Sequence, residues 1–453
     1  MPRRGGLAYA GDRLNLVDSG THYGMPKGLA QLLGRFSPKG LRFELLLGLG
    51  MRAAGAVAAF AMTWLIARMF GAETFGHFQL ALATATILAL VATQGLDRLI
   101  VRTASAAFAR EQAGAALNFF VHARNRQLLV SVPLAILAWL IAEPIAVHVL
   151  DEPEVTWHLR LLAPAIIALP LIKASSSLLR AKGSVLVSQS LDGVGYTTIA
   201  IVVIVALHLT GSALSSLAPS AAYLGGVVLV AAAGVLLVRN AMRFVERESD
   251  PVPLASGLFI AAFSVLVALT DWLGLFLLTA FRDAAEAGIY RVGFQICLLF
   301  TLVNSSFALM AGPRLATAFD QGNAEEAWNT VRTSSGIGLA IVAPLFFAIL
   351  FAAEPILSLF GVEFVRGADA LRILAIGQFI NVAAGPAGAA LTMMKRERAV
   401  LMIEIATVFV CVALLLWLLP AYGMVGAAIA SATGALLRNA GALLVLRRLL
   451  AAF

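Results

Sequence analysis

The chain has 453 residues, of which 60% are hydrophobic and only 13% are charged. An ordinary globular protein carries about 25% charged residues, so this composition excludes a water-soluble fold. The formal net charge of +8 and the pI near 9.9 do not indicate a nucleic-acid partner, because the basic residues are scattered between apolar stretches and form no basic face with interleaved aromatic residues.

Residues 1–40 precede the first apolar stretch and hold basic residues among Gly, Pro and polar residues. This segment lacks the apolar core of a cleavable signal peptide, so we expect a disordered basic cytoplasmic extension.

The two cysteines, Cys297 and Cys411, lie within apolar stretches, where a thiol behaves as a small hydrophobic group. The sequence therefore predicts neither a disulfide framework nor a metal cluster.

The rest of the chain alternates between long apolar stretches and short polar connections. Stretches of about 20 apolar residues are long enough to cross about 30 Å of hydrocarbon as helices. We expect an all-α polytopic membrane protein with about twelve spans. The predicted spans are 44–69, 76–96, 127–150, 159–179, 184–208, 217–238, 254–281, 288–312, 333–353, 368–393, 399–419 and 423–446.

The Lys and Arg residues predict the topology. With a cytoplasmic N-terminus, most of the 33 Lys and Arg fall in segments on the cytoplasmic side, which is the positive-inside pattern. We therefore expect both termini in the cytoplasm. The spans divide into an N-terminal six-helix lobe, residues 41–238, and a C-terminal six-helix lobe, residues 254–453, joined by a cytoplasmic linker, residues 239–253.

Short segments recur between the two halves at a spacing of 211 or 212 residues. Ala142–Ile145 reads Ala-Glu-Pro-Ile, as does Ala353–Ile356, and Gly76 after the first span corresponds to Gly288 after the seventh. Because each half holds an even number of spans, the pseudo-symmetry axis should run along the membrane normal. The sequence thus predicts two pseudo-symmetric lobes.

Three segments resemble a known family. Gly71–Phe78 is similar to the Gly-x-x-x-(aromatic)-Gly-x-(aromatic) turn of Wzx-like polysaccharide flippases, a branch of the multidrug/oligosaccharidyl-lipid/polysaccharide (MOP) exporter superfamily. Phe360–Phe364 with Ala370–Leu374, and Leu419–Ala430, resemble the same family's second half. The resemblance covers roughly residues 41–450, and the basic extension is longer than the family usually shows.

The resemblance implies a flippase in the bacterial inner membrane. Its cargo would be undecaprenyl-pyrophosphate-linked oligosaccharide units for O-antigen, capsule or exopolysaccharide assembly, with membrane lipids and a polysaccharide polymerase complex as partners. Two alternatives within the superfamily stay open, a cation-coupled multidrug antiporter and a lipid II flippase. A membrane scaffold that transports nothing is a third alternative, from a different class.

Enzyme motifs are absent from the sequence: it has no Gly-x-x-x-x-Gly-Lys-Ser/Thr phosphate loop and no His-Glu-x-x-His. We therefore expect a transporter, not an enzyme, without a cofactor. The energy source stays open, with coupling to a proton or sodium gradient as one option. The residues able to carry this function are ionisable groups within the spans, because a charge in the bilayer usually faces a cavity or a partner.

Arg52 in the first span is the leading candidate for binding the substrate pyrophosphate, since a guanidinium matches phosphate oxygens with a rigid fork of donors. The alternative is that its side chain reaches to the cytoplasmic interface. Lys173 in the fourth span is a second candidate, for which reaching to the cytoplasmic interface is an equal alternative. Asp271 in the seventh span is the candidate ion-coupling residue. Asp192 and Glu404 lie closer to cytoplasmic ends, where pairing or contact with water is the simpler expectation.

The remaining candidates come from helix periodicity. Arg98 and Arg102 are four residues apart, so they share a helix face, either at a substrate entrance or as positive-inside anchors. Further candidates for a polar strip along a cavity, or for hydrogen bonds between helices, are Arg291, Gln295, Asn304 and Asn381. Interruptions are expected at Pro344 in the ninth span and at Gly385 and Pro386 in the tenth.

Overall fold

The computed structural model describes residues 41–210, 215–247, 258–394 and 396–451. The expected extension, residues 1–40, lies outside the described residues, as does part of the expected linker, residues 248–253. The chain divides into two units, Met1–Leu46 and Leu47–Phe453. The described residues of the second unit form helices joined by turns and contain no strand, which confirms the expected all-α class.

In the first half of the second unit, apolar segments form helices that pack through buried Ala, Leu, Ile and Phe side chains. The helices of this half are α2 (Leu41–Thr93), α3 (Leu96–Phe108), α4 (Ala113–His148), α5 (Val155–Leu162), α6 (Ala165–Ala181), α7 (Val185–Gln189), the π-helical turn η1 (Ser190–Val194), α8 (Gly195–Leu209) and α9 (Ala218–Ala241).

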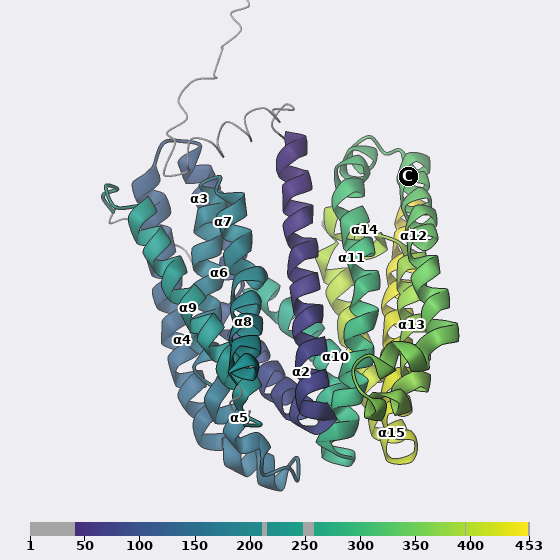
Figure 1. The fold of residues 1–453 in the computed structure, drawn as a ribbon. Helices are drawn as coiled ribbons and strands as arrows, with labels where there is room; N and C mark the ends of the chain where they lie inside the picture. Colours follow the sequence, from purple (N-terminus) through teal and green to yellow (C-terminus); the bar gives the residue numbers. More distant parts are fainter. Residues whose placement is uncertain (1–40, 211–214, 248–257, 395, 452–453) are drawn as a thin grey trace, which may run out of the picture. The chain divides into compact units, whose positions relative to one another are not determined.

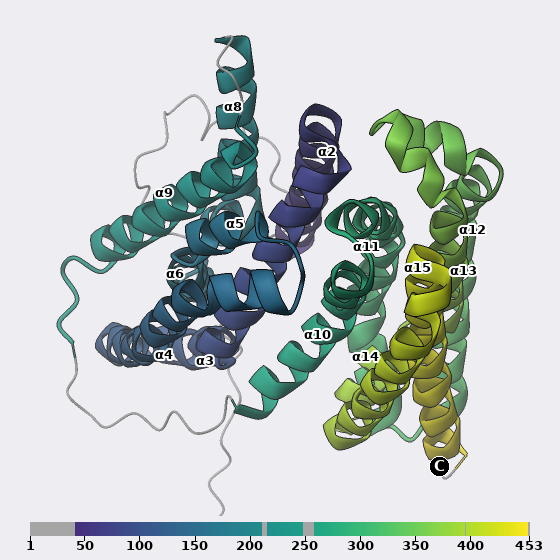
Figure 2. The same ribbon diagram turned by 90° about the horizontal axis from the view of Figure 1, so that it is seen from below.

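The second half continues with equally apolar helices. They are α10 (Leu258–Phe281), α11 (Ala284–Asp320), α12 (Ala324–Ser358), the 3-10 turn η3 (Val362–Gly367), α13 (Ala368–Ala384), α14 (Ala387–Met393) and α15 (Glu397–Leu450). Seen along the helices, α3–α9 gather on one side and α11–α15 on the other, and α2 and α10 lie between these two groups (Figures 1 and 2).

Nine helices of the described residues are long and apolar enough to cross a membrane. Two of them, α2 and α15, each cover two of the expected spans, because a single glycine breaks the helix where a loop was expected. These glycines are Gly71 (φ 79°) and Gly423 (φ 51°), both in the left-handed region that glycine adopts without a steric cost. The count of twelve spans stays a prediction.

Several helices extend beyond the spans expected from hydropathy. Helix α4 begins at Ala113, whereas the expected span began at residue 127, and its first turns carry polar and basic side chains. Such turns are invisible to an apolar-stretch criterion although they continue the same helix. The expected break at Pro344 is wrong because this proline lies inside α12, whereas Gly385 (φ 63°) and Pro386 do separate α13 from α14.

The two halves meet near the break in α2 at Gly71 and near the start of α11. Trp64 donates its indole N–H to the carbonyl of Leu359 over 3.0 Å, and the ring of Phe60 packs edge-on against Phe360 at 5.8 Å. Gly76 packs against the backbone of Ala284 in the other half. This contact joins segments that the positive-inside distribution predicts to lie on the outer side of the membrane.

Candidate functional site

The first half carries its intramembrane charges at a break in one helix. Between α7 and α8, Asp192 (ψ 76°) and Gly193 (φ 112°) leave the helical conformation. Lys173 on α6 donates to the Asp192 carboxylate over 2.6 Å, and Arg180 lies 3.6 Å from its second oxygen. Broken helices and π-helical turns in membrane proteins are tolerated where they line cavities, and they frequently mark functional sites.

The structure thus gives Lys173 a partner, in agreement with the pairing expected for Asp192. The Lys173 side chain remains 40% exposed and that of Asp192 22% exposed, so the pair is accessible to a ligand. The hydropathy reading missed Arg180 and the break itself. The Asp-Gly dipeptide at Asp192, a strong turn signal, was the available clue.

The other cationic candidates of the first half differ in their surroundings. Arg98 and Arg102 both lie on the exposed face of α3, while its Leu99, Ile100 and Ala104 are buried. The shared face expected from their spacing is therefore present. Arg52 belongs to α2, but its side chain lies outside the described residues.

The second half holds a cluster of ionisable groups between α10, α11 and α15. Glu404 is only 2% exposed and forms an ion pair with Arg438 at 2.9 Å, and it accepts a hydrogen bond from Thr270 over 3.1 Å. Asp271, the residue after Thr270, interacts electrostatically with Arg438, Arg291 and Glu404. The cluster therefore contains two acids and two arginines from the same three helices.

Arg291 is the most deeply buried cation of this cluster, with 6% of the residue exposed. Its guanidinium carbon lies 3.5 Å from the centre of the Trp272 ring, a short cation–π contact. The buried Nε and Nη1 atoms have no hydrogen-bond partner. Buried donors are nearly always satisfied in proteins, so these two are available to an incoming acceptor.

The amide candidates do not form one strip. Asn381 on α13 donates to Gln378 over 3.0 Å and accepts from Asn439 on α15 over 2.9 Å, so it links helices within the second half. Gln295 and Asn304 are partly buried on α11, and no hydrogen bond within the described residues joins either of them to Asn381. The helix-bonding reading fits Asn381 better than the cavity reading.

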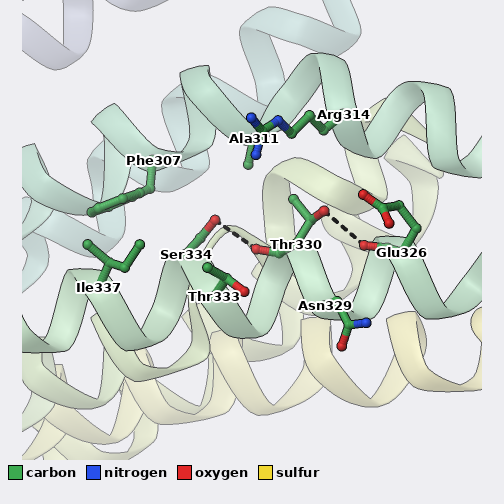
Figure 3. A pocket seen from close by; sticks show the side chains of 9 residues that line it. All are labelled: Phe307, Ala311, Arg314, Glu326, Asn329, Thr330, Thr333, Ser334 and Ile337. Carbon is green, nitrogen blue, oxygen red and sulfur yellow. Dashed lines mark hydrogen bonds between the residues drawn. The ribbon is translucent and has the colours of Figure 1, made fainter.

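A polar pocket of about 300 Å³ lies between α11 and α12. Figure 3 shows that its lining changes along the helices, from the apolar Phe307 and Ile337 through the hydroxyls of Thr330 and Ser334 to the charged Arg314 and Glu326. Thr330 and Ser334 donate along their own helix, to the Glu326 and Thr330 carbonyls. Their oxygens therefore keep acceptor capacity for ligand hydroxyls.

The described residues contain no group of three or more His, Cys, Asp or Glu side chains placed to hold a metal ion. Cys297 and Cys411 are free thiols, both buried. The chemistry that this structure offers is therefore that of ion pairs, hydroxyls and buried arginines within helices.

Two protein-family models match the sequence. The model described as "Polysaccharide biosynthesis protein" matches residues 47–319, and the model described as "MatE" matches residues 260–418. None of the curated proteins matches the chain.

Solved structures with the same fold come from the MOP superfamily. An inward-facing multidrug resistance MATE transporter has a TM-score of 0.73 and 14% identity, and the alignment covers 90% of this chain and 98% of that one. The lipid II flippase MurJ, in an inward closed conformation, has a TM-score of 0.67 and 14% identity, with coverages of 89% and 87%. A MOP transporter from Pyrococcus furiosus has a TM-score of 0.62, 16% identity and coverages of 91% and 95%. These likenesses confirm the expected MATE-like fold.

Proposed function

Because the chain belongs to the family of polysaccharide biosynthesis proteins, a premise that rests on the match over residues 47–319, we propose that it flips undecaprenyl-pyrophosphate-linked oligosaccharide units across the bacterial inner membrane. The units would serve O-antigen, capsule or exopolysaccharide assembly, beside a polysaccharide polymerase. In this proposal both termini are cytoplasmic, and the two halves rock about their contact to expose the cargo alternately to the two sides.

Several observations support an amphiphilic, anionic cargo. The pocket between α11 and α12 offers hydroxyls and Arg314 at one end and apolar side chains at the other, which suits a molecule with sugars, phosphate and hydrocarbon. Lys173 and Arg291 provide partly exposed and unsatisfied cationic donors within the spans. In this proposal Arg52, Lys173, Arg98, Arg102 and Arg291 bind or guide the pyrophosphate.

For the energy source, we propose an ion gradient that acts on the second half. Asp271 and Glu404 are acids within its spans. Glu404 is paired with Arg438, and both Arg438 and Arg291 interact electrostatically with Asp271. A proton or sodium ion on Asp271 would release an arginine and so change how tightly the cluster holds the cargo.

The runner-up function is a cation-coupled multidrug antiporter, favoured by the match of the "MatE" model to residues 260–418. A lipid II flippase is a further candidate, on the likeness to MurJ in fold. A cationic drug would require acidic groups in the cavity, whereas the accessible acid Asp192 is already paired with Lys173 and Arg180.

The test is complementation of a deletion strain. Loss of surface polysaccharide on blots, restored by the wild-type gene, supports the proposal, and Arg52→Ala at normal expression should fail to restore it. Unchanged polysaccharide combined with drug hypersensitivity would instead establish the antiporter, and failure of the deletion strain to divide would indicate the lipid II function.

A further inference from the structure

Two glutamates at equivalent positions of the repeat each accept a hydrogen bond from the other half. The Glu152 carboxylate, in the loop after α4, accepts a hydrogen bond of 2.8 Å from the backbone N–H of Ala284 in the second half. The Glu363 carboxylate, in η3, accepts one of 2.8 Å from the N–H of Ala72 in the first half. The two glutamates are 211 residues apart and the two alanines 212, so the repeat has produced a reciprocal pair of bonds.

Each of these bonds ends on the N-terminus of a helical segment. Ala284 is the first residue of α11, and Ala72 follows the break at Gly71 inside α2. The first N–H groups of a helix lack partners within it, and the helix dipole favours a negative charge there. A charged carboxylate from one half therefore stabilises a helix start in the other half, and this interaction weakens when the carboxylate is neutralised.

The two glutamates differ in their other neighbours. The second oxygen of Glu152 lies 3.2 Å from Nε2 of His77, a residue that is 1% exposed. The buried Nδ1 atom of His77 has no hydrogen-bond partner. The ring of His158 lies 5.7 Å from that of His77, and its Nδ1 is 2.8 Å from the Ser220 hydroxyl. Among the described residues, Glu363 has no histidine partner.

We propose that the His77–Glu152 pair forms a proton-binding site that controls the contact between the two halves. A proton taken up by the His77–Glu152 pair cancels its negative charge, whichever of the two residues carries it. The start of α11 then faces a pair without net charge, so the favourable interaction of this helix N-terminus with Glu152 is weakened, while the equivalent interaction of Glu363 is unaffected. Acid therefore favours separation of the halves at this end.

The other charged groups on the elements around this site are already engaged or exposed. Asp283 accepts from the N–H of Glu286, and Glu286 accepts from the N–H of Met424, so both hold backbone groups within the second half. Asp151 and Glu154 beside Glu152, and Glu73 on α2, are exposed. Tyr223 on α9 packs its ring against Phe78.

This proposal rests on the proposed transport function. It names a second site, besides Asp271, at which a proton gradient would act. This end of the molecule is predicted to face the periplasm, so external acid would open the outer side. The site differs from Asp271 in lying between the halves, so protonation changes their separation directly.

The experiment measures that separation in the full-length protein in lipid nanodiscs. Nitroxide labels are placed by Val149→Cys and Val362→Cys, two positions that are 61% and 85% exposed in different halves, with Cys297→Ala and Cys411→Ala. Electron–electron double resonance between about pH 8 and pH 5 should show the ratio of separated to joined molecules rising about tenfold, as expected when one charge-assisted bond is weakened.

Matched glutamine variants make the result decisive. In Glu152→Gln the fraction of separated molecules should be high at both pH values. In Glu363→Gln the contact should be weakened equally at both pH values, and the separated fraction should still rise when the pH is lowered. His77→Gln should reduce the step. A full step in Glu152→Gln, an equal loss of the step in Glu363→Gln, or no step in the wild type would overturn the proposal.

Two further arms guard this reading. If Glu152→Gln fails to fold by size-exclusion chromatography, the comparison of His77→Gln with Glu363→Gln carries the test alone. Because no cargo is present, the step also stands apart from the flippase proposal: unchanged surface polysaccharide in the deletion strain would end that proposal and leave the step intact.

Discussion

Gly76 and Gly288 occupy equivalent positions in the two halves, and each lies against the backbone of the other half. A Cβ atom on Gly76 would overlap the carbonyl oxygen of Ala284, and one on Gly288 would overlap the carbonyl oxygen of Ala72. The repeat that places the two glycines 212 residues apart therefore also accounts for the closest approach between the halves. Only a residue without a side chain permits this approach.

Replacing either glycine by alanine should force the halves apart. Because the overlap is with backbone and not with a flexible side chain, Gly76→Ala or Gly288→Ala should cost about 1–3 kcal/mol of the joined state. The measurement is the thermal unfolding midpoint of the purified protein together with the spin-label distance between Val149→Cys and Val362→Cys.

Gly225→Ala is the matched control, because nothing lies within 4 Å of the Cβ that it would add on α9. It should leave both readouts at their wild-type values. Wild-type distances in Gly76→Ala would mean that the two helix starts yield without cost, contrary to the packing described.

The buried ion pair of the second half should be sensitive to loss of its arginine. Arg438→Leu leaves Glu404, 2% exposed, without its charge partner, which should destabilise the protein by about 3–5 kcal/mol. The exposed pair of Arg372 and Glu354 gives the comparison. Because Glu354 is 61% exposed, Glu354→Gln should lower the free energy of unfolding by no more than about 1 kcal/mol. Thermal unfolding in detergent checks both, and similar losses from the two variants would contradict the difference in burial.

The sequence predicts the helical class well, since long apolar stretches are visible in the composition of each segment. It predicts breaks less well. A single non-helical residue, Gly71, separates the first two predicted spans. The break at Asp192 and Gly193 lies within a predicted span. Hydropathy averages over many residues, so a one-residue departure from helical geometry leaves no trace in it.

The candidate residues were found by one criterion, a charge within a span, and this criterion cannot give partners. It identified Lys173 and Asp192 separately, although their contact depends on how α6 packs beside the broken helix. It missed Glu152 and His77, because a loop carboxylate and a lone histidine are unremarkable until folding joins them. Partners depend on tertiary packing, which one sequence does not specify.

Arg291 should be needed for transport more than for stability. Its buried Nε and Nη1 atoms have no hydrogen-bond partner, so Arg291→Met removes unsatisfied donors together with the interactions with Asp271 and Trp272, and the unfolding temperature should fall less than in Arg438→Leu. If these donors bind the cargo phosphate, transport should fall at least about tenfold, the loss expected for one charge-assisted bond. Arg291→Lys keeps the charge but not the planar stack on Trp272, so it should recover only part of the activity.

A large drop in unfolding temperature with Arg291→Met, with transport per folded molecule unchanged, would instead assign Arg291 to packing against Trp272. The activity readout is surface polysaccharide in the complemented deletion strain, normalised to the amount of folded protein in the membrane.

The pair of Lys173 and Asp192 allows a double-mutant test of structural against substrate-binding roles. If their 2.6 Å contact only holds α6 to the broken helix, Lys173→Met and Asp192→Leu should each impair complementation, and the double variant should recover it. Neither member of the pair is then left without the other, and the partly exposed Arg180 keeps its hydrogen bond to Ser188. If Lys173 also binds the cargo pyrophosphate, the double variant should fold and remain inactive.

We expect the second outcome, since the Lys173 side chain keeps 40% of its surface exposed beside the break at Asp192 and Gly193. Arg180, 3.6 Å from the same carboxylate, provides the internal check. Arg180→Gln leaves the Lys173–Asp192 contact in place, so it should lower transport less than Lys173→Met does. A fully active double variant would remove Lys173 from the substrate path and leave the cationic contact to Arg52 and Arg291.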